Sequence, residues 1–216
     1  MELLSLVETM TEEMPNLAAG ALVVSWFGDD LRCGECTIRP KVEDAVIEGE
    51  NMPWGVAGLS RATAQVITEQ DGRPIYGGTP TDASVVEAIQ AMKDAGKAVM
   101  FYPFILMDQV AGNTLPDPYS DAQTQPELPW RGRITLSKAP GQDNSPDETA
   151  AADAQVAAFF GTVTASDFAV ADGIVTYTGP EEWSLTRFIL HYAALCKAAG
   201  GVDSFCISSE MRGLTQ

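Results

Sequence analysis

The sequence has few basic residues, one histidine and no long apolar run. Its 216 residues include 13 lysines and arginines against 30 aspartates and glutamates, which gives a formal net charge of −17. A chain with this charge repels phosphate backbones and acidic lipid surfaces, so we expect no nucleic-acid partner and no membrane partner. The apolar runs, such as 98–107 and 202–207, are far shorter than the roughly 20 residues of a membrane-spanning helix.

Cysteine is also scarce, with four residues in the whole chain. Four irregularly spaced cysteines are too few to stabilise a chain of this length by disulfides, so we expect free thiols, with Cys196 and Cys206 inside apolar stretches. The first residues, MELLSLVETMTEEMP, are acidic and lack the basic start and apolar centre of a signal peptide. We therefore expect synthesis without a signal peptide.

Apolar and β-branched runs alternate with helical patterns along most of the chain. The stretches between successive runs are too long for hairpins, which favours parallel strands joined by crossovers. A polar segment rich in proline and glycine, from Asp108 to Ser145, predicts a long loop. The expected strands are 21–27, 62–68, 98–107 and 202–208, and the expected helices are 2–14, 82–95, 147–160 and 181–199.

This alternation predicts an α/β fold that forms the N-terminal half of a (β/α)₈ barrel with parallel strands. A complete barrel of this kind needs roughly 250 residues, so we expect the chain to stop after about the fourth strand. Residues 1–20 are assigned to an N-terminal helix and lead-in, and residues 21–216 to the partial barrel domain.

Glu210 is the leading candidate for a catalytic residue, because it directly follows the last expected strand. Barrel enzymes carry their chemistry at the carboxyl ends of the strands. Hydrolysis of a glycosidic bond needs two carboxyl groups, one of which protonates the leaving oxygen. Arg212 is placed to bind a sugar hydroxyl or a neighbouring carboxylate. The alternative is that Glu210 is an exposed acid paired loosely with Arg212.

Three aspartates and three aromatic residues occupy similar strand-end positions. Asp29, Asp30 and Asp108 are candidates for shaping a sugar site, although Asp29 and Asp30 are also typical turn formers. The flat aromatic rings are candidates for stacking on sugar rings, although most such rings pack in the core or at the rim. These substrate-binding candidates are Asp29, Asp30, Asp108, Trp26, Tyr102 and Trp130.

Other motifs carry weaker chemical signals. Cys33 and Cys36 form a C-x-x-C pair, which leaves open a zinc or redox module. The sequence has no second pair to complete four metal ligands, so we expect no metal and no cofactor. His191 lies within an expected helix, away from the strand ends, so we expect no general-base role for it. Residues 77–79 (GGT) lack the rest of a phosphate-binding loop, so we expect no phosphate site there.

Several stretches taken together resemble the TIM-barrel-like domain of the tail-hub, or baseplate, protein of gene transfer agents and tailed phages. The resemblance covers nearly everything from Val23 to Thr215. The stretches that carry it are 23–32 (VVSWFGDDLR), 76–85 (YGGTPTDASV), 102–108 (YPFILMD), 115–119 (LPDPY), 129–135 (PWRGRIT), 157–161 (AAFFG) and 187–215 (RFILHYAALCKAAGGVDSFCISSEMRGLT).

The resemblance implies a glycoside-hydrolase-like domain that acts on or binds cell-envelope glycans. It implies that Glu210 is the general acid/base, that the second carboxylate comes from a later strand absent here, and that this part alone is inactive. It also implies a location in the tail of a virion or gene transfer agent, after synthesis in the bacterial cytoplasm, with other baseplate proteins as partners. A structural or glycan-binding barrel without turnover is the alternative.

Overall fold

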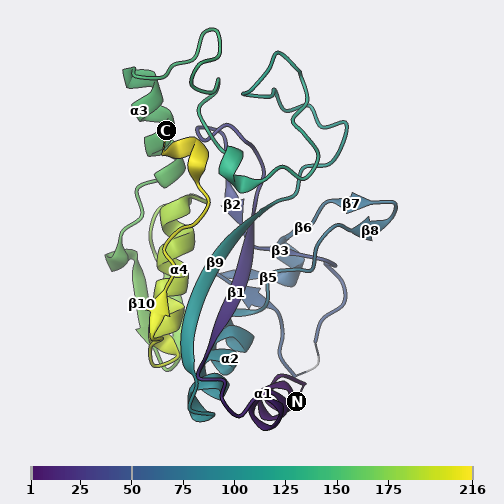
Figure 1. The fold of residues 1–216 in the computed structure, drawn as a ribbon, viewed down its shortest axis with the longest axis vertical. Coiled ribbons are helices and arrows are strands. Elements are labelled where there is room, and N and C mark those ends of the chain that lie inside the picture. Colours follow the sequence, from purple (N-terminus) through teal and green to yellow (C-terminus); the bar gives the residue numbers. More distant parts are fainter. Residues whose placement is uncertain (1, 50, 216) are drawn as a thin grey trace.

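The computed structural model describes residues 2–49 and 51–215, and its centre is a four-stranded mixed sheet in the order β12-β9-β1-β2 (Figure 1). The two long strands, β1 (Ala19–Gly28) and β9 (Ala98–Met107), pair in parallel along their whole length. Both are runs of β-branched, aromatic and other apolar residues, which suits strands at the centre of a sheet. Their carboxyl ends therefore meet at one edge of the molecule.

The outer strands of this sheet are short. β12 (Ser204–Phe205) pairs in parallel with β9, while β2 (Ile38–Arg39) pairs antiparallel with the end of β1. The other strands form two-stranded sheets of their own. They are β3 (Lys41–Val42) with β6 (Gln65–Val66), β4 (Gly55–Val56) with β5 (Leu59–Ser60), β7 (Glu69–Gln70) with β8 (Arg73–Pro74), and β10 (Phe168–Ala171) with β11 (Ile174–Tyr177).

The α-helices lie close to their expected ranges, although α3 and α4 begin a few residues later than expected. α4 begins after Ser184, whose Oγ accepts the N–H of Arg187 at 3.2 Å, and α3 begins after Thr149, whose hydroxyl accepts the N–H of Ala151. None of the described helices is long and apolar enough to cross a membrane. The α-helices are α1 (Glu2–Glu13), α2 (Asp82–Asp94), α3 (Ala150–Phe160) and α4 (Leu185–Ala198), and the 3₁₀ helices are η1 (Arg61–Thr63), η2 (Arg131–Arg133), η3 (Ala165–Asp167) and η4 (Arg212–Leu214).

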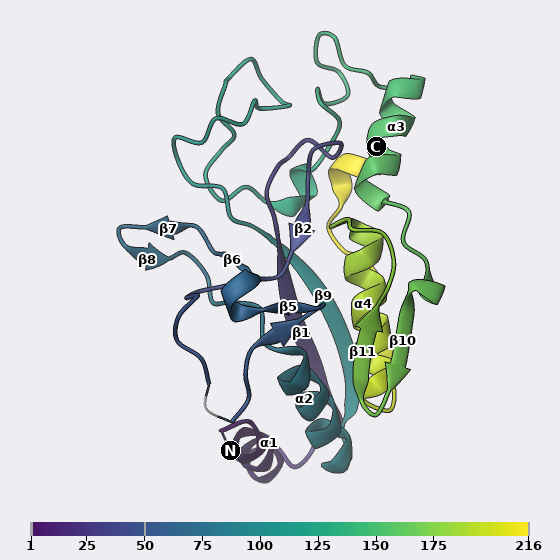
Figure 2. The same cartoon turned by 180° about the vertical axis from the view of Figure 1, so that it is seen from behind.

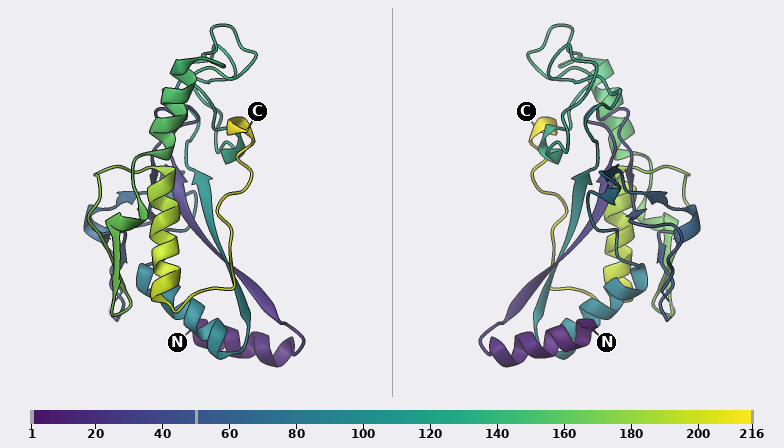
Figure 3. Two further views of the ribbon diagram at one scale, coloured as in Figure 1. Left: turned by 90° about the vertical axis from the view of Figure 1, so that its left-hand side faces the viewer. Right: turned by 90° about the vertical axis from the view of Figure 1, so that its right-hand side faces the viewer.

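The core lies between the central sheet and helix α4, which runs along one face of β1 and β9 (Figure 3). Trp26 from β1 packs against Phe188 and Tyr192 from α4, with ring centroids 5.1 and 5.8 Å apart. Phe101 from β9 packs on Tyr192 at 5.2 Å. The β10–β11 hairpin lies on the outer side of α4 (Figure 2). The buried aromatic cluster thus fixes α4 to the sheet.

The expectation of a half-barrel of parallel strands is wrong. Residues 62–68 form part of η1 and the two-residue strand β6, which joins β3 and not the central sheet. Apart from two small alanines, this stretch has only Val66 and Ile67 as apolar residues, too few for a strand buried on both faces. In 202–208 the polar Asp203 and Ser204 interrupt the run, and only two residues are extended. The antiparallel β2 also departs from a barrel.

Candidate functional site

The polar loops gather at the carboxyl ends of β1 and β9. The segment 130–135 connects them, because Thr135 donates its N–H to Leu31 and accepts the N–H of Cys33, both just beyond β1. The same segment packs against the C-terminal residues. Gly213 lies so close to the carbonyl of Ile134 that a Cβ there would clash with it. Residues distant in the sequence therefore share one edge, as the parallel pairing of β1 and β9 predicts.

Glu210 lies at this edge, where it accepts one hydrogen bond and forms one ion pair. Its Oε2 accepts the indole N–H of Trp130 at 2.8 Å and pairs with Nη2 of Arg131 at 2.9 Å. Its side chain is 53% exposed. Its backbone has φ of 57°, in the left-handed region that non-glycine residues seldom adopt. The turn thus holds the carboxylate of Glu210 outward, and Trp130 and Arg131 fix the direction of that side chain.

Arg131 is the residue that organises this cluster, and it is not among the candidates predicted from the sequence. Its side chain is 5% exposed, and its guanidinium lies 3.6 Å from the ring centroid of Phe104 in β9. Besides its ion pair with Glu210, it donates to Ser209 Oγ at 3.0 Å and to the hydroxyl of Tyr102 at 3.3 Å. Tyr102 and Ser209 also contact each other through their hydroxyl groups. A buried cation therefore joins β9 to the turn that carries Glu210.

Trp130 presents a large ring beside this pair and is 45% exposed. Its position depends on Gly132, because a Cβ at that residue would overlap the six-membered ring of Trp130. The structure therefore brings three of the candidates, Glu210, Trp130 and Tyr102, into one cluster through Arg131. We call Tyr102, Trp130, Arg131, Ser209 and Glu210 the rim cluster.

Trp26 does not lie at this rim, so its expected position is wrong. Its side chain is fully buried, and its indole N–H donates to the hydroxyl of Tyr192 at 2.8 Å. Trp26 faces α4 because alternate residues of a strand point to opposite sides of the sheet. Its ring belongs to the core and is covered on the side where a sugar would have to stack.

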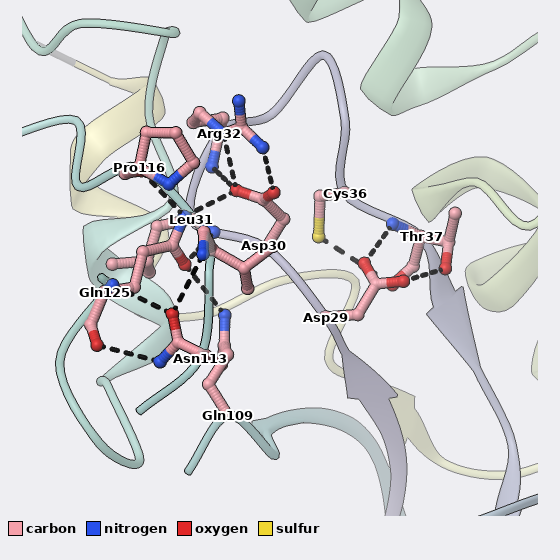
Figure 4. A network of polar contacts seen from close by, with 11 residues as sticks. Asp29, Asp30, Leu31, Arg32, Cys36, Thr37, Gln109, Asn113, Pro116 and Gln125 are labelled. Carbon is pink, nitrogen blue, oxygen red and sulfur yellow. Dashed lines mark hydrogen bonds and ion pairs between the residues drawn. The ribbon is translucent and has the colours of Figure 1, made fainter. Parts of the chain in front are cut away.

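Asp29 and Asp30 hold the loop that leaves β1 (Figure 4). Asp29 accepts the N–H and the hydroxyl of Thr37 at 2.7 and 2.6 Å. Asp30, 4% exposed, binds the guanidinium of Arg32 and accepts the side-chain amide of Gln125 at 2.7 Å. The hydrogen bond to Asp30 raises the pKa of Arg32 above its ordinary value. Both carboxylates therefore already have partners within the protein that order the loops.

Asp108 follows β9 directly and forms a buried ion pair. Its carboxylate lies 2.9 Å from Nζ of Lys41, and the two side chains are 3% and 9% exposed. The N–H and hydroxyl of Thr68 also donate to it, at 3.4 and 3.3 Å. Asp108 thereby ties the segment that carries β3 and β6 to the end of β9. This contact is structural, and the side chain is closed to solvent.

The remaining candidates lie around the cluster or away from it. Arg212 is exposed and begins η4, two residues beyond Glu210. His191 is buried in α4, and its Nε2 lies 2.9 Å from Asp82 at the start of α2. Among residues 2–49 and 51–215, no group of three or more potential metal ligands comes together.

Cys33 and Cys36 are free and buried, in keeping with the expectation of reduced thiols. Burial raises the pKa of Cys33 to about 11. Burial, and then the charge of Asp29, raise the pKa of Cys36 well above its ordinary value. A thiol must ionise to attack a disulfide or to bind zinc, so these surroundings disfavour a redox or metal module.

Cys33 is expected to resist alkylation by iodoacetamide in the folded protein. At pH 8 a thiol with a pKa of about 11 is only about 0.1% ionised. Labelling is expected to rise with pH and to become rapid on unfolding in urea. The measurement is mass spectrometry of labelled peptides, with the less buried Cys206 as the internal control. Equal labelling of Cys33 and Cys206 at pH 8 in the native protein would contradict this assignment.

The fold and the rim cluster together define an α/β protein with a polar and aromatic site at the carboxyl edge of its central sheet. Residues 183–216 match a protein-family model described as the GTA TIM-barrel-like domain. This match supports a gene transfer agent TIM-barrel-like domain. The matched segment includes helix α4, strand β12 and Glu210. Comparison with curated proteins gives no match.

Proposed function

We propose that this chain serves the tail baseplate of a gene transfer agent as a glycan-recognising domain. Its ligands are cell-envelope glycans, its partners are other tail or baseplate proteins, and its site is the rim cluster. The proposal is supported by the family match over residues 183–216, which includes Glu210. It is also supported by a site that offers an exposed ring beside an exposed carboxylate.

The observation that carries the proposal is the pairing of Trp130 with Glu210 at 2.8 Å. Binding sites combine aromatic surface with a few placed polar groups. Stacking of a sugar ring on Trp130 would bring its hydroxyl groups beside Glu210, a hydrogen-bond acceptor. Arg131, held by Phe104 and Ser209, keeps that acceptor in place. The remaining exposed side of the carboxylate is open to a ligand.

Trp130→Ala is expected to weaken binding to cell-envelope glycans by at least about tenfold, because it removes the stacking surface. Glu210→Gln is expected to weaken binding by several-fold while leaving the ring. The measurement is isothermal titration calorimetry with soluble peptidoglycan and lipopolysaccharide oligosaccharides. Glu127→Gln, an exposed acid of the same loop region, is the matched control. Unchanged affinity of Trp130→Ala for every glycan that the native chain binds would exclude this site.

Hydrolysis is the second candidate function, with Glu210 as general acid/base. It is favoured by the left-handed backbone of Glu210, because strained residues of this kind cluster at active sites. Hydrolysis needs a second carboxyl group, about 5 Å away in retaining enzymes and roughly 6.5–9.5 Å away in inverting ones. Asp29, Asp30 and Asp108 already accept hydrogen bonds from the protein, so we propose that this group comes from elsewhere.

The two candidates separate in a reducing-sugar assay on the same glycans, with the chain and any partner that completes the site. Turnover that Glu210→Gln lowers by about 10²-fold or more, with binding largely retained, would support hydrolysis. Binding without turnover would leave recognition as the function. Turnover unaffected by Glu210→Gln would remove Glu210 from the catalytic role.

A further inference from the structure

Helix α3 is largely apolar, yet little of it is covered. Its sequence, AAADAQVAAFF, has Asp153 and Gln155 as its only polar residues, and Phe159 is its one fully buried residue. Phe160, the next residue, is 46% exposed. A helix exposed to water normally carries a broad polar face, and one exposed acid does not supply it. The composition of α3 therefore fits a helix that a partner covers.

A groove runs beside this helix. It has a volume of about 500 Å³, within the range of ligand-binding sites. Val156 and Phe160 of α3 form one wall, and Leu136 and Leu214 contribute apolar surface from the loop and from η4. Asp147 and Asp153 also line it, from the amino-terminal side of α3. The groove thus combines an apolar floor with two exposed carboxylates at one end.

We infer that the groove and the exposed face of α3 form a docking surface for an amphipathic helical segment of another protein, one that carries lysine or arginine beside its apolar side chains. Helix-in-groove binding uses apolar side chains at helical spacing as anchors. The chain has a net charge of −17 and acids at the groove end, so a basic segment is attracted and a second copy of this chain is repelled. An acidic lipid surface is repelled for the same reason.

The inference is tested with a synthetic amphipathic helical peptide of leucine and lysine and with its counterpart of leucine and glutamate. Binding to the full chain is followed by fluorescence anisotropy of the labelled peptide. Ala157→Gln fills the groove while keeping a residue suited to helices. The double variant Asp147→Asn/Asp153→Asn removes the acids. Asp71→Asn/Asp172→Asn, at the turns of two hairpins with left-handed backbone that asparagine tolerates, changes the net charge equally.

The native chain is expected to bind the lysine peptide and not the glutamate peptide. Ala157→Gln and the groove double variant are each expected to weaken binding by about tenfold, and the hairpin double variant by less than about twofold. Equal weakening by the two double variants would overturn the inference, because the peptide would then respond to net charge alone. Absence of binding, or a dimer in sedimentation that Ala157→Gln dissociates, would overturn it as well. Glycan binding does not enter this experiment, so its outcome is independent of the proposed function.

Discussion

Asp108→Ala is expected to lower the free energy of unfolding by about 3–5 kcal/mol, because it leaves the ammonium group of Lys41 buried without its partner. The Lys41–Asp108 pair is nearly closed to solvent, with a separation of 2.9 Å. It connects the segment after β2 with the end of β9, and Thr68 adds two further hydrogen bonds to the carboxylate. Its removal therefore weakens the packing of the whole 41–68 region on the central sheet.

Urea denaturation followed by circular dichroism measures this effect. The matched control is the double variant Lys41→Met/Asp108→Leu, which removes both charges and is expected to be far closer to the native chain in stability. A loss below about 1 kcal/mol for Asp108→Ala would mean that water reaches Lys41, and would contradict the buried pair.

Trp26→Ala is expected to lower the free energy of unfolding by about 3–5 kcal/mol, as is usual when a fully buried large side chain is truncated in a core. Trp26 contacts Phe188, Tyr192 and Trp183, and its indole N–H binds the hydroxyl of Tyr192. Trp130→Ala is expected to cost about 1 kcal/mol or less, because Trp130 is 45% exposed and loses one hydrogen bond.

The two tryptophan variants are compared by the same denaturation experiment, and glycan affinity is measured on each folded protein. Trp26→Phe, which keeps an aromatic ring in the cluster, is expected to fall between the native chain and Trp26→Ala. A similar loss of stability for Trp26→Ala and Trp130→Ala would contradict the assignment of one ring to the core and the other to the rim.

The longest elements of the fold could be predicted because their patterns are strong. The apolar runs predicted β1 and β9, and the four α-helices of the described residues lie within about four residues of their expected bounds, although the caps of α3 and α4 are not the residues expected. The β10–β11 hairpin was missed, although Asp172-Gly173 between alternating apolar residues is a typical hairpin signal. The prediction of a strand of the central sheet at 62–68 failed for another reason. Gln65–Val66 are extended as expected, but nothing in the local sequence specifies the strand with which they pair.

The candidate site was predicted in part. Glu210 lies at the carboxyl edge as expected, although strand β12 ends at Phe205 and Glu210 does not follow it directly. Arg131 was missed, because its role depends on Phe104, Tyr102 and Ser209, which are distant in the sequence. Trp26 is buried and Trp130 is exposed, and the sequence does not distinguish the two rings. The alternation of side chains along a strand does not show which face of the sheet a helix covers.

The most direct test of the glycan site is a titration of the labelled chain with peptidoglycan and lipopolysaccharide oligosaccharides, followed by the indole N–H signals of its four tryptophans in ¹⁵N NMR. The Trp130 signal is expected to shift on binding, since its N–H is bonded to Glu210 at the exposed rim. The signals of Trp26 and Trp54, whose N–H groups are bonded in the interior, are expected to stay in place. Glycan binding that leaves the Trp130 signal unmoved would exclude the rim cluster as the glycan site.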